Sequence, residues 1–126
     1  MQLLFDTNIF IYHLNNQLPT VGKGLLRLGI AGQGAYSIIS KIELLGFQQA
    51  EATDIQAQRI LSRLVELPLT TAIADRTIDL RKHFKIKVPD AIIAATAMEY
   101  SLQLVTRNTT DFNEIETLSL INPFEG

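Results

Sequence analysis

Four acidic residues, far apart in the sequence, each stand at the end of an apolar segment. They are Asp6, Glu43, Asp90 and Asp111. Carboxylates that share a pocket repel one another, so they must either take up protons at raised pKa or bind a cation. Mg²⁺ is the natural partner of such oxygen ligands, with Mn²⁺ as the alternative. A divalent ion held by carboxylates suits phosphodiester hydrolysis, because it lowers the pKa of a bound water and neutralises charge on the phosphate.

Each acid also has a purely structural interpretation. Asp6 is suited to cap a helix N-terminus. Glu43 and Ser40 have the spacing of a capping box, in which each side chain satisfies a free backbone N–H. Asp90 follows a proline at a helix start, where its negative charge interacts favourably with the helix dipole. Asp111 belongs to a residue type that is common in turns. One shared site explains all four positions together, whereas the structural interpretation needs four separate coincidences.

The elements that must position these acids alternate between strand and helix. Strands are expected at 2–5, 35–39, 66–69, 103–106 and 118–121, and helices at 9–14, 19–30, 40–50, 53–66, 71–84 and from Pro89 onward. Parallel strands need crossover helices, so this alternation predicts one α/β domain over residues 1–126, a three-layer α/β/α sandwich with a small, mostly parallel sheet. The proline in 66–69 favours an edge strand, and the apolar run after Asp90 predicts a buried helix. Ligands bind beyond the carboxyl ends of such strands, which is where the acids are expected.

Composition excludes several other kinds of site. The 126 residues carry a net charge of −2 and contain no cysteine, which excludes disulfides and cysteine-based metal sites. The two histidines lack metal-ligand spacing, so a zinc site is not expected. Neither a phosphate-binding P-loop nor a Gly-x-Ser-x-Gly elbow is present. No signal peptide and no membrane-spanning run is found, and a cytoplasmic protein is expected.

A local basic run lies just before Asp90, at residues 81–87. It has two interpretations of about equal weight, the solvated end of a helix and a set of phosphate contacts. The candidate contacts to a phosphodiester substrate are Lys41, Arg81, Lys82, Lys85, Lys87 and Arg107.

Four segments together resemble the motifs of PIN-domain nucleases, in the order in which that family has them. They are residues 3–11, 38–46, 89–97 and 104–112. The resemblance runs from residue 3 to about residue 121, and the chain is similar in size to the VapC-type toxins of toxin–antitoxin pairs. It implies a magnesium-dependent endoribonuclease, a homodimer, and a cognate antitoxin that blocks the site and supplies the DNA-binding part.

The resemblance also implies roles for individual residues. The four acids form the catalytic site, and Asp6 and Asp90 are the expected direct metal ligands. Thr7, Thr106 and Asn108 are expected to orient the carboxylates by hydrogen bonds. A water activated by one or two metal ions would attack the phosphodiester in line and leave a 5′-phosphate and a 3′-hydroxyl.

Three other functions remain open at this point. The chain is alternatively a catalytically silent PIN-like module that binds RNA or protein, or a nuclease of housekeeping RNA processing. A receiver-like phosphoacceptor domain is disfavoured, because Asp6 has no acidic neighbour and Arg107, rather than a lysine, follows Thr106.

Overall fold

The computed structural model of the chain describes residues 1–125 and contains one parallel sheet. In spatial order its strands are β3 (Val65–Leu67), β2 (Gly34–Ser37), β1 (Leu3–Phe5), β4 (Gln103–Val105) and β5 (Leu120–Ile121). All four pairings are parallel, and the completely buried β1 lies in the middle. The carboxyl ends of the strands therefore meet at one edge of the sheet, as predicted.

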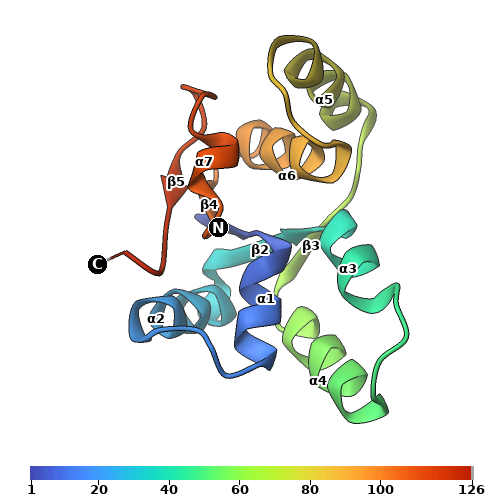
Figure 1. Cartoon of the computed structure of the whole chain (residues 1–126), viewed down its shortest axis with the longest axis vertical. Helices are drawn as coiled ribbons and strands as arrows, with labels where there is room; N and C mark the ends of the chain where they lie inside the picture. The colour runs from blue at the N-terminus through green and yellow to red at the C-terminus, as the bar shows by residue number, and fades with distance from the viewer. Residues whose placement is uncertain (126) are drawn as a thin grey trace.

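Within residues 1–125, seven α-helices and one wider helical turn connect and cover these strands (Figure 1). They are α1 (Thr7–Leu14), α2 (Thr20–Leu28), the turn η1 (Gly29–Gln33), α3 (Ile38–Leu45), α4 (Glu51–Ser62), α5 (Thr71–His83), α6 (Val88–Glu99) and α7 (Thr109–Phe112). In η1, Gly32 has a φ of 117°, which glycine adopts without steric cost. Within residues 1–125 no helix is long and apolar enough to cross a bilayer.

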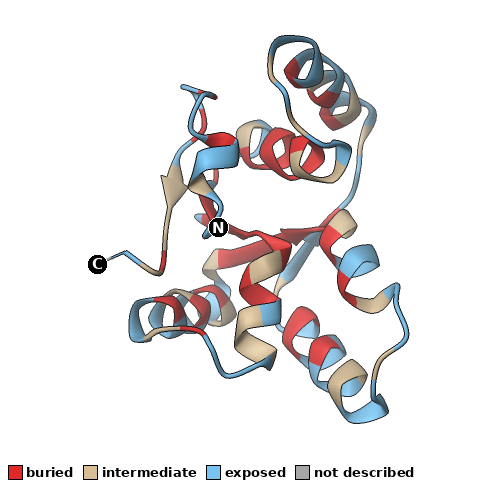
Figure 2. Cartoon of the chain, viewed as in Figure 1, coloured by how far each residue is buried: buried red, intermediate tan, exposed pale blue. Residues whose placement is uncertain are grey.

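The sheet separates two apolar clusters, which confirms the α/β/α sandwich. One cluster packs β1 residues such as Phe5 against α1, α2 and α4, and the other packs Leu4 and Leu104 against α6. Side chains alternate between the two faces of a strand, so Leu4 and Phe5 serve opposite clusters. Figure 2 shows the burial that results, with β1 and much of α6 coloured as buried.

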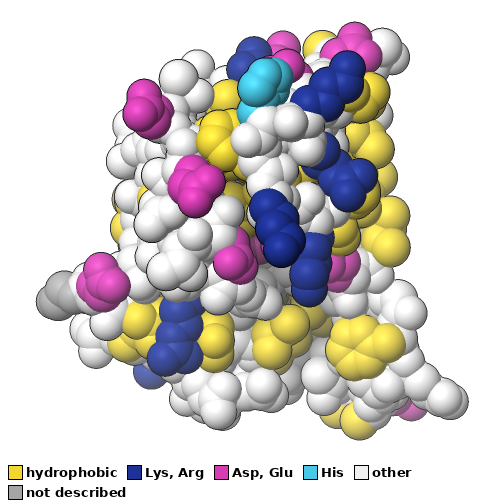
Figure 3. Space-filling model, turned by 45° about the horizontal axis from the view of Figure 1, so that its top comes forward, with side chains coloured by type: hydrophobic (Ala, Val, Ile, Leu, Met, Phe, Trp, Pro, Cys, Tyr) yellow, Lys and Arg dark blue, Asp and Glu magenta, His cyan; other side chains and the backbone are white. Residues whose placement is uncertain are grey.

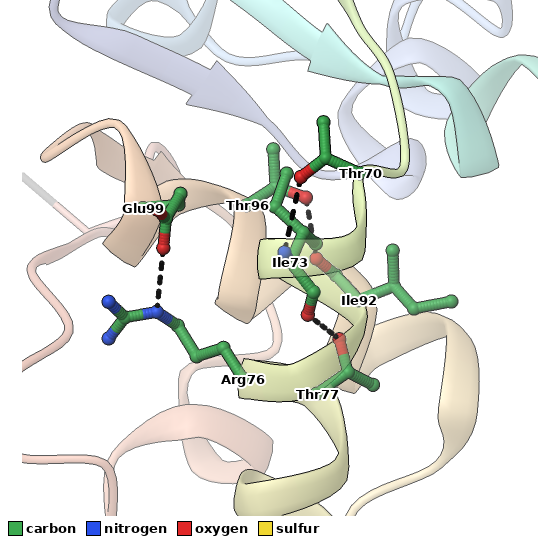
Figure 4. Close-up of polar contacts among 7 residues, drawn as sticks. All are labelled: Thr70, Ile73, Arg76, Thr77, Ile92, Thr96 and Glu99. Carbon is green, nitrogen blue, oxygen red and sulfur yellow. Dashed lines mark hydrogen bonds and ion pairs between the residues drawn. The ribbon is translucent and has the colours of Figure 1, made fainter.

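Helix α6 is the buried helix that the apolar run predicted. Every residue from Ala91 to Ala97 is buried, because the sheet covers one side of α6 and α5 covers another. Figure 4 shows the polar contacts of this pair: Thr70 Oγ1 accepts from the N–H of Ile73 and caps α5, and Arg76 Nε donates to Glu99 Oε2 across the helices at 3.1 Å. This packing holds the N-terminus of α6, with Asp90, at the carboxyl edge of the sheet.

The capping box predicted for Ser40 and Glu43 is wrong. Helix α3 begins at Ile38, and Ser37 is its cap, with Oγ accepting from the N–H of Ile39. Ser40 and Glu43 therefore lie within a running helix, where i and i+3 share a face. The pair Ile38–Ile39 was predicted as the end of a strand because an apolar run this short does not distinguish strand from helix.

Several other boundaries differ from the prediction. Helix α1 begins at Thr7 rather than at residue 9, because Asp6 caps it. Helix α3 stops before Gly46 instead of reaching residue 50, as a glycine after a helix commonly signals. Helix α4 spans 51–62 rather than 53–66. Strand β3 occupies 65–67, directly before Pro68 and one residue earlier than expected, and it lies at the edge of the sheet as predicted. The polar segment 107–112 contains the short helix α7, which the burial of Phe112 explains.

Candidate active site

Asp6 is the buried centre of the acidic site. It follows β1, caps α1, and is only 3% exposed. Its Oδ1 accepts from the backbone N–H of Thr7 at 2.8 Å, and its Oδ2 accepts from the hydroxyl of Thr106, also at 2.8 Å. Thr106 follows β4, the strand that pairs with β1, so the parallel register brings the two side chains together across 100 residues of sequence.

The surroundings of Asp6 disfavour its ionised form. Burial, together with the negative charges of Asp90 and Glu43, raises the pKa of Asp6 from 3.8 to about 6, against the lowering effect of the hydrogen bonds from Thr106 and Thr7. A carboxyl group that is both buried and faced by like charges is typical of functional sites. A bound cation would remove the repulsion that the donors only partly offset.

Glu43 is held by hydroxyl groups. Thr7 Oγ1 lies 2.8 Å from Glu43 Oε1 and 2.8 Å from Ser40 Oγ. A hydroxyl donates one proton, so when Thr7 donates to Glu43, Ser40 donates to Thr7. This chain of two hydrogen bonds ties α3 to the start of α1 and turns the Glu43 carboxylate toward the acidic site.

Asp90 opens α6 and faces the other acids. Burial raises the pKa of Asp90, and the charges of Asp111 and Glu43 raise it further, while Lys87 lowers it. Asp90 lies in a cleft of about 590 Å³ at the carboxyl edge of the sheet. Its walls are formed by Asn8, Glu43, Arg81, Lys85, Ile86, Lys87, Pro89, Asp90, Asn108 and Asp111. The structure thus brings together the four predicted acids, with Asp6 beneath the walls of this carboxylate cleft.

Thr7, Thr106 and Asn108 were predicted to orient the carboxylates. The two threonines donate to Glu43 and to Asp6 respectively. Asn108 lines the carboxylate cleft, and its backbone N–H donates to Thr106 Oγ1 at 3.1 Å, so it acts on Asp6 through that hydroxyl. All three residues therefore belong to the surroundings of the acids.

The six candidate RNA contacts divide into two groups. Arg81, Lys85 and Lys87 line the carboxylate cleft on the α5–α6 side. Figure 3 shows basic side chains gathered beside acidic ones on this face of the molecule. The remaining candidates do not line the cleft. They are Lys41, which pairs with Glu66 at 3.2 Å, Lys82 on α5, and Arg107, which lies over the rings of Tyr12 and Phe124.

The carboxylate cleft fits a hydrated divalent ion better than an all-protein metal cage. Within residues 1–125, no three Asp, Glu or His side chains converge as the ligands of one ion would. Mg²⁺ is commonly bound through one or two carboxylates while water completes its octahedron. Asp6 and Asp90 supply two carboxylates whose pKa is raised by burial first and by neighbouring negative charges second, and a bound cation would favour their ionised forms.

Two residues of the site had no predicted role there. Ser40, completely buried, orients Thr7, and Asn8 lines the carboxylate cleft. Asn8 follows Asp6–Thr7 directly, so its place in that short polar stretch was a usable signal. The role of Ser40 depends on where α3 begins, which the sequence pattern placed two residues too late.

Comparisons with known proteins agree with this geometry. The PIN domain model matches residues 3–118. The chain is 33% identical over 122 residues to Ribonuclease VapC10 of Mycobacterium tuberculosis, an alignment that covers 92% of this chain and 90% of the relative.

Solved structures with the same fold include a toxin–antitoxin complex from Klebsiella pneumoniae, with 34% identity, a TM-score of 0.81 and coverage of 99% of this chain and 100% of the other. VapBC2 from Rickettsia felis, bound to a DNA fragment from its promoter, gives 26% identity and a TM-score of 0.84, with coverage of 97% and 98%. With a family model that spans most of its length and a VapC relative aligned almost end to end, the chain belongs to the PIN-domain family and is of the VapC type.

Proposed function

We propose that this protein is a magnesium-dependent endoribonuclease and the toxin of a toxin–antitoxin pair. The observation that carries the proposal is the position of Asp6, which is buried, hydrogen-bonded on both oxygens and faced by the charges of Asp90 and Glu43. A helix cap needs no other acids around it. A concentration of carboxylates would instead hold a divalent ion that neutralises charge on a phosphodiester, and the ribonuclease relative supports RNA as the substrate.

Asp6 and Asp90 are the proposed direct ligands of the ion, which when bound would lower the pKa of a water and neutralise charge on the phosphate. Thr106 fixes the rotamer of Asp6 by donating to its Oδ2. Thr7 fixes Glu43 in the same way, so the carboxylates keep their directions despite their mutual repulsion. Orientation of ligands by such neighbours commonly changes metal affinity or activity by 10- to 100-fold.

RNA would enter along the basic wall of the carboxylate cleft. Arg81, Lys85 and Lys87 line it, and they offset the negative charge that would otherwise repel a phosphate backbone. The Nε of Arg81 donates to the carbonyl of Ile86 at 3.3 Å, which holds this arginine over the α5–α6 connection. We expect these cations to position the strand while the carboxylates act on the bond.

An antitoxin is the proposed protein partner, and a homodimer the proposed assembly. Support for the antitoxin comes from similar structures, which are described as toxin–antitoxin or VapBC complexes. An antitoxin that covers the carboxylate cleft would inhibit cleavage without changing the site itself.

The test is cleavage of a mixed cellular RNA pool by the purified chain, with Mg²⁺, with chelator, and with Asp90→Asn in Mg²⁺. The matched control is Asp75→Asn, which removes the same charge from an exposed position of α5 outside the carboxylate cleft. We expect fragments with 5′-phosphate and 3′-hydroxyl ends from the wild type and from the control, and none with chelator or with Asp90→Asn.

Each alternative function gives a different result. Binding of RNA without cleavage by the folded wild type would identify a silent PIN-like module. Cleavage that persists in chelator or in Asp90→Asn would refute the carboxylate mechanism. Cleavage restricted to precursors of stable RNAs would favour housekeeping processing over a toxin.

A further inference from the structure

Arg107 contacts two aromatic side chains, those of Tyr12 and Phe124. Its guanidinium carbon lies 4.2 Å from the ring centroid of Phe124 and 5.3 Å from that of Tyr12. One guanidinium N–H group donates to the hydroxyl of Tyr12 at 3.2 Å. The two rings meet edge to face with centroids 4.9 Å apart, so α1, the β4–α7 loop and the C-terminal segment all hold this one arginine.

Arg107 has no ion-pair partner among residues 1–125. The residue is exposed. Its contacts with the rings and with the Tyr12 hydroxyl leave most of its five N–H donors available. A planar guanidinium with free donors is suited to bind a phosphate through two hydrogen bonds at once.

In the sequence, Arg107 lies between two residues of the acidic site. Its neighbour Thr106 donates to Asp6, and its neighbour Asn108 lines the carboxylate cleft. Tyr12 is six residues after Asp6 on α1, which is about 9 Å along a helix axis. The tyrosine that holds the guanidinium is therefore attached less than two helical turns from Asp6.

Arg107 and the basic wall of the cleft lie toward opposite faces of the sheet. Arg81, Lys85 and Lys87 belong to α5, α6 and their connection, which cover one face, while Tyr12 belongs to α1, which covers the other (Figure 1). The acids occupy the sheet edge between them. An RNA strand that crosses this edge of the sheet would meet basic side chains on both sides of the phosphodiester bond that lies over the carboxylates.

We propose that Arg107 is a phosphate-binding residue for the RNA strand on the α1 side of the carboxylate cleft, with Tyr12 and Phe124 as the positioning residues that hold its guanidinium. This inference rests on the proposed function, because it assigns a path to the RNA substrate. Arg107 would touch the RNA, whereas the two aromatic rings would act only by holding Arg107 in place.

The experiment separates binding from cleavage. A short, labelled single-stranded RNA of mixed sequence is titrated with the full chain carrying Asp90→Asn, in chelator, over about 50 to 200 mM salt. Each phosphate contact to a single strand contributes about 0.7 to the slope of log affinity against log salt. We expect Arg107→Gln to weaken binding roughly tenfold and to reduce the slope by about 0.7, the value of one phosphate contact.

Three further variants in the same background complete the test. Arg59→Gln removes one charge from an exposed position of α4 outside the carboxylate cleft, and it should leave the slope unchanged. Phe124→Leu keeps the charge of Arg107 but removes the ring beneath it, so it should weaken binding while the slope stays. Arg107→Lys should restore the slope but only part of the affinity, because an ammonium group does not form the two-point contact.

An unchanged slope in Arg107→Gln would overturn the inference and leave Arg107 as a residue that only fastens the C-terminal segment. An equal loss of slope in Arg59→Gln would also overturn it, since the effect would then be one of net charge. Both results leave the proposed nuclease intact if the wild-type chain cleaves RNA in Mg²⁺. If the wild-type chain neither binds nor cleaves RNA, the proposed function itself fails.

Discussion

Replacing Asp6 by asparagine should make the metal-free protein more stable at neutral pH. The ionised Asp6 is buried against the charges of Asp90 and Glu43, and its pKa is raised from 3.8 to about 6. A shift of this size corresponds to about 3 kcal/mol of folding free energy lost above pH 6, at 1.36 kcal/mol per unit. Asparagine offers one oxygen where aspartate offers two, so one hydrogen bond worth about 1–2 kcal/mol is weakened. The expected net gain is about 1–2 kcal/mol.

The pH dependence has a definite sign. Between pH 3.8 and about 6 the folded wild type holds a proton on Asp6 that the unfolded chain has released. The free energy of unfolding therefore falls as the pH rises through this interval and levels off above it. Asp6→Asn has no such proton, so the variant should be less stable than the wild type by about 1–2 kcal/mol near pH 4, where only the weakened hydrogen bond counts, and more stable by about 1–2 kcal/mol near pH 7.

Urea unfolding in chelator at several pH values measures this difference directly. Subtracting the wild-type curve from the variant curve removes the titration of groups common to both. Asp75→Asn, exposed on α5, is the control for the loss of one carboxylate away from the acidic site. If Asp6→Asn were less stable than the wild type at pH 7, Asp6 would be a helix cap whose hydrogen bonds outweigh its charge, and the reasoning from repulsion would be refuted.

Three further predictions concern the ion, a hydrogen-bond donor and a surface pair. Adding Mg²⁺ should raise the melting temperature of the wild type in calorimetry, because a ligand at about 100 times its Kd stabilises the folded state by about 2.7 kcal/mol. The Asp90→Asn variant should show little of this rise. Thr106→Val removes a hydrogen-bond donor to Asp6, so the free energy of unfolding in urea should fall by about 1–3 kcal/mol. NMR titration should show a further raised pKa of Asp6, and an unchanged pKa would contradict the prediction. Arg76→Ala breaks an ion pair with Glu99 that is substantially exposed, and its cost in urea unfolding should stay below about 1 kcal/mol.

The strands and their common edge were predictable from the sequence because each apolar run is followed directly by a polar or helix-starting residue. The apolar run Leu3–Phe5 is followed directly by Asp6, and the run that ends at Val105 is followed by Thr106, Arg107 and Asn108. Alternation with helices indicates parallel pairing, and parallel pairing places the strand ends on one side. The convergence of the acids follows from topology alone, without any knowledge of side-chain contacts.

The contacts that hold the acids were predictable only in part. Ser40 and Glu43 have a spacing that both a helix start and a running helix satisfy, and only the burial of Ser40 against Thr7 distinguishes them. Arg107 beside Tyr12 and Phe124 joins three distant segments, and no local pattern brings these together. Local spacing predicts elements, whereas contacts between elements depend on the packed fold.

The substitution Asp6→Asn should raise the stability of the protein and abolish its activity. These opposite effects would distinguish a catalytic acid from a residue that only caps a helix. The hydroxyl of Thr106 stabilises the charge of Asp6 without neutralising it, and the folded chain keeps a carboxylate at a free-energy cost. Selection for stability alone would place an asparagine or serine at this cap, because both accept the same backbone hydrogen bond without a buried charge. If Asp6→Asn unfolds at higher urea concentration but no longer cleaves RNA, the repulsion is a cost tolerated for function. If the variant loses both properties, the acid serves the fold first.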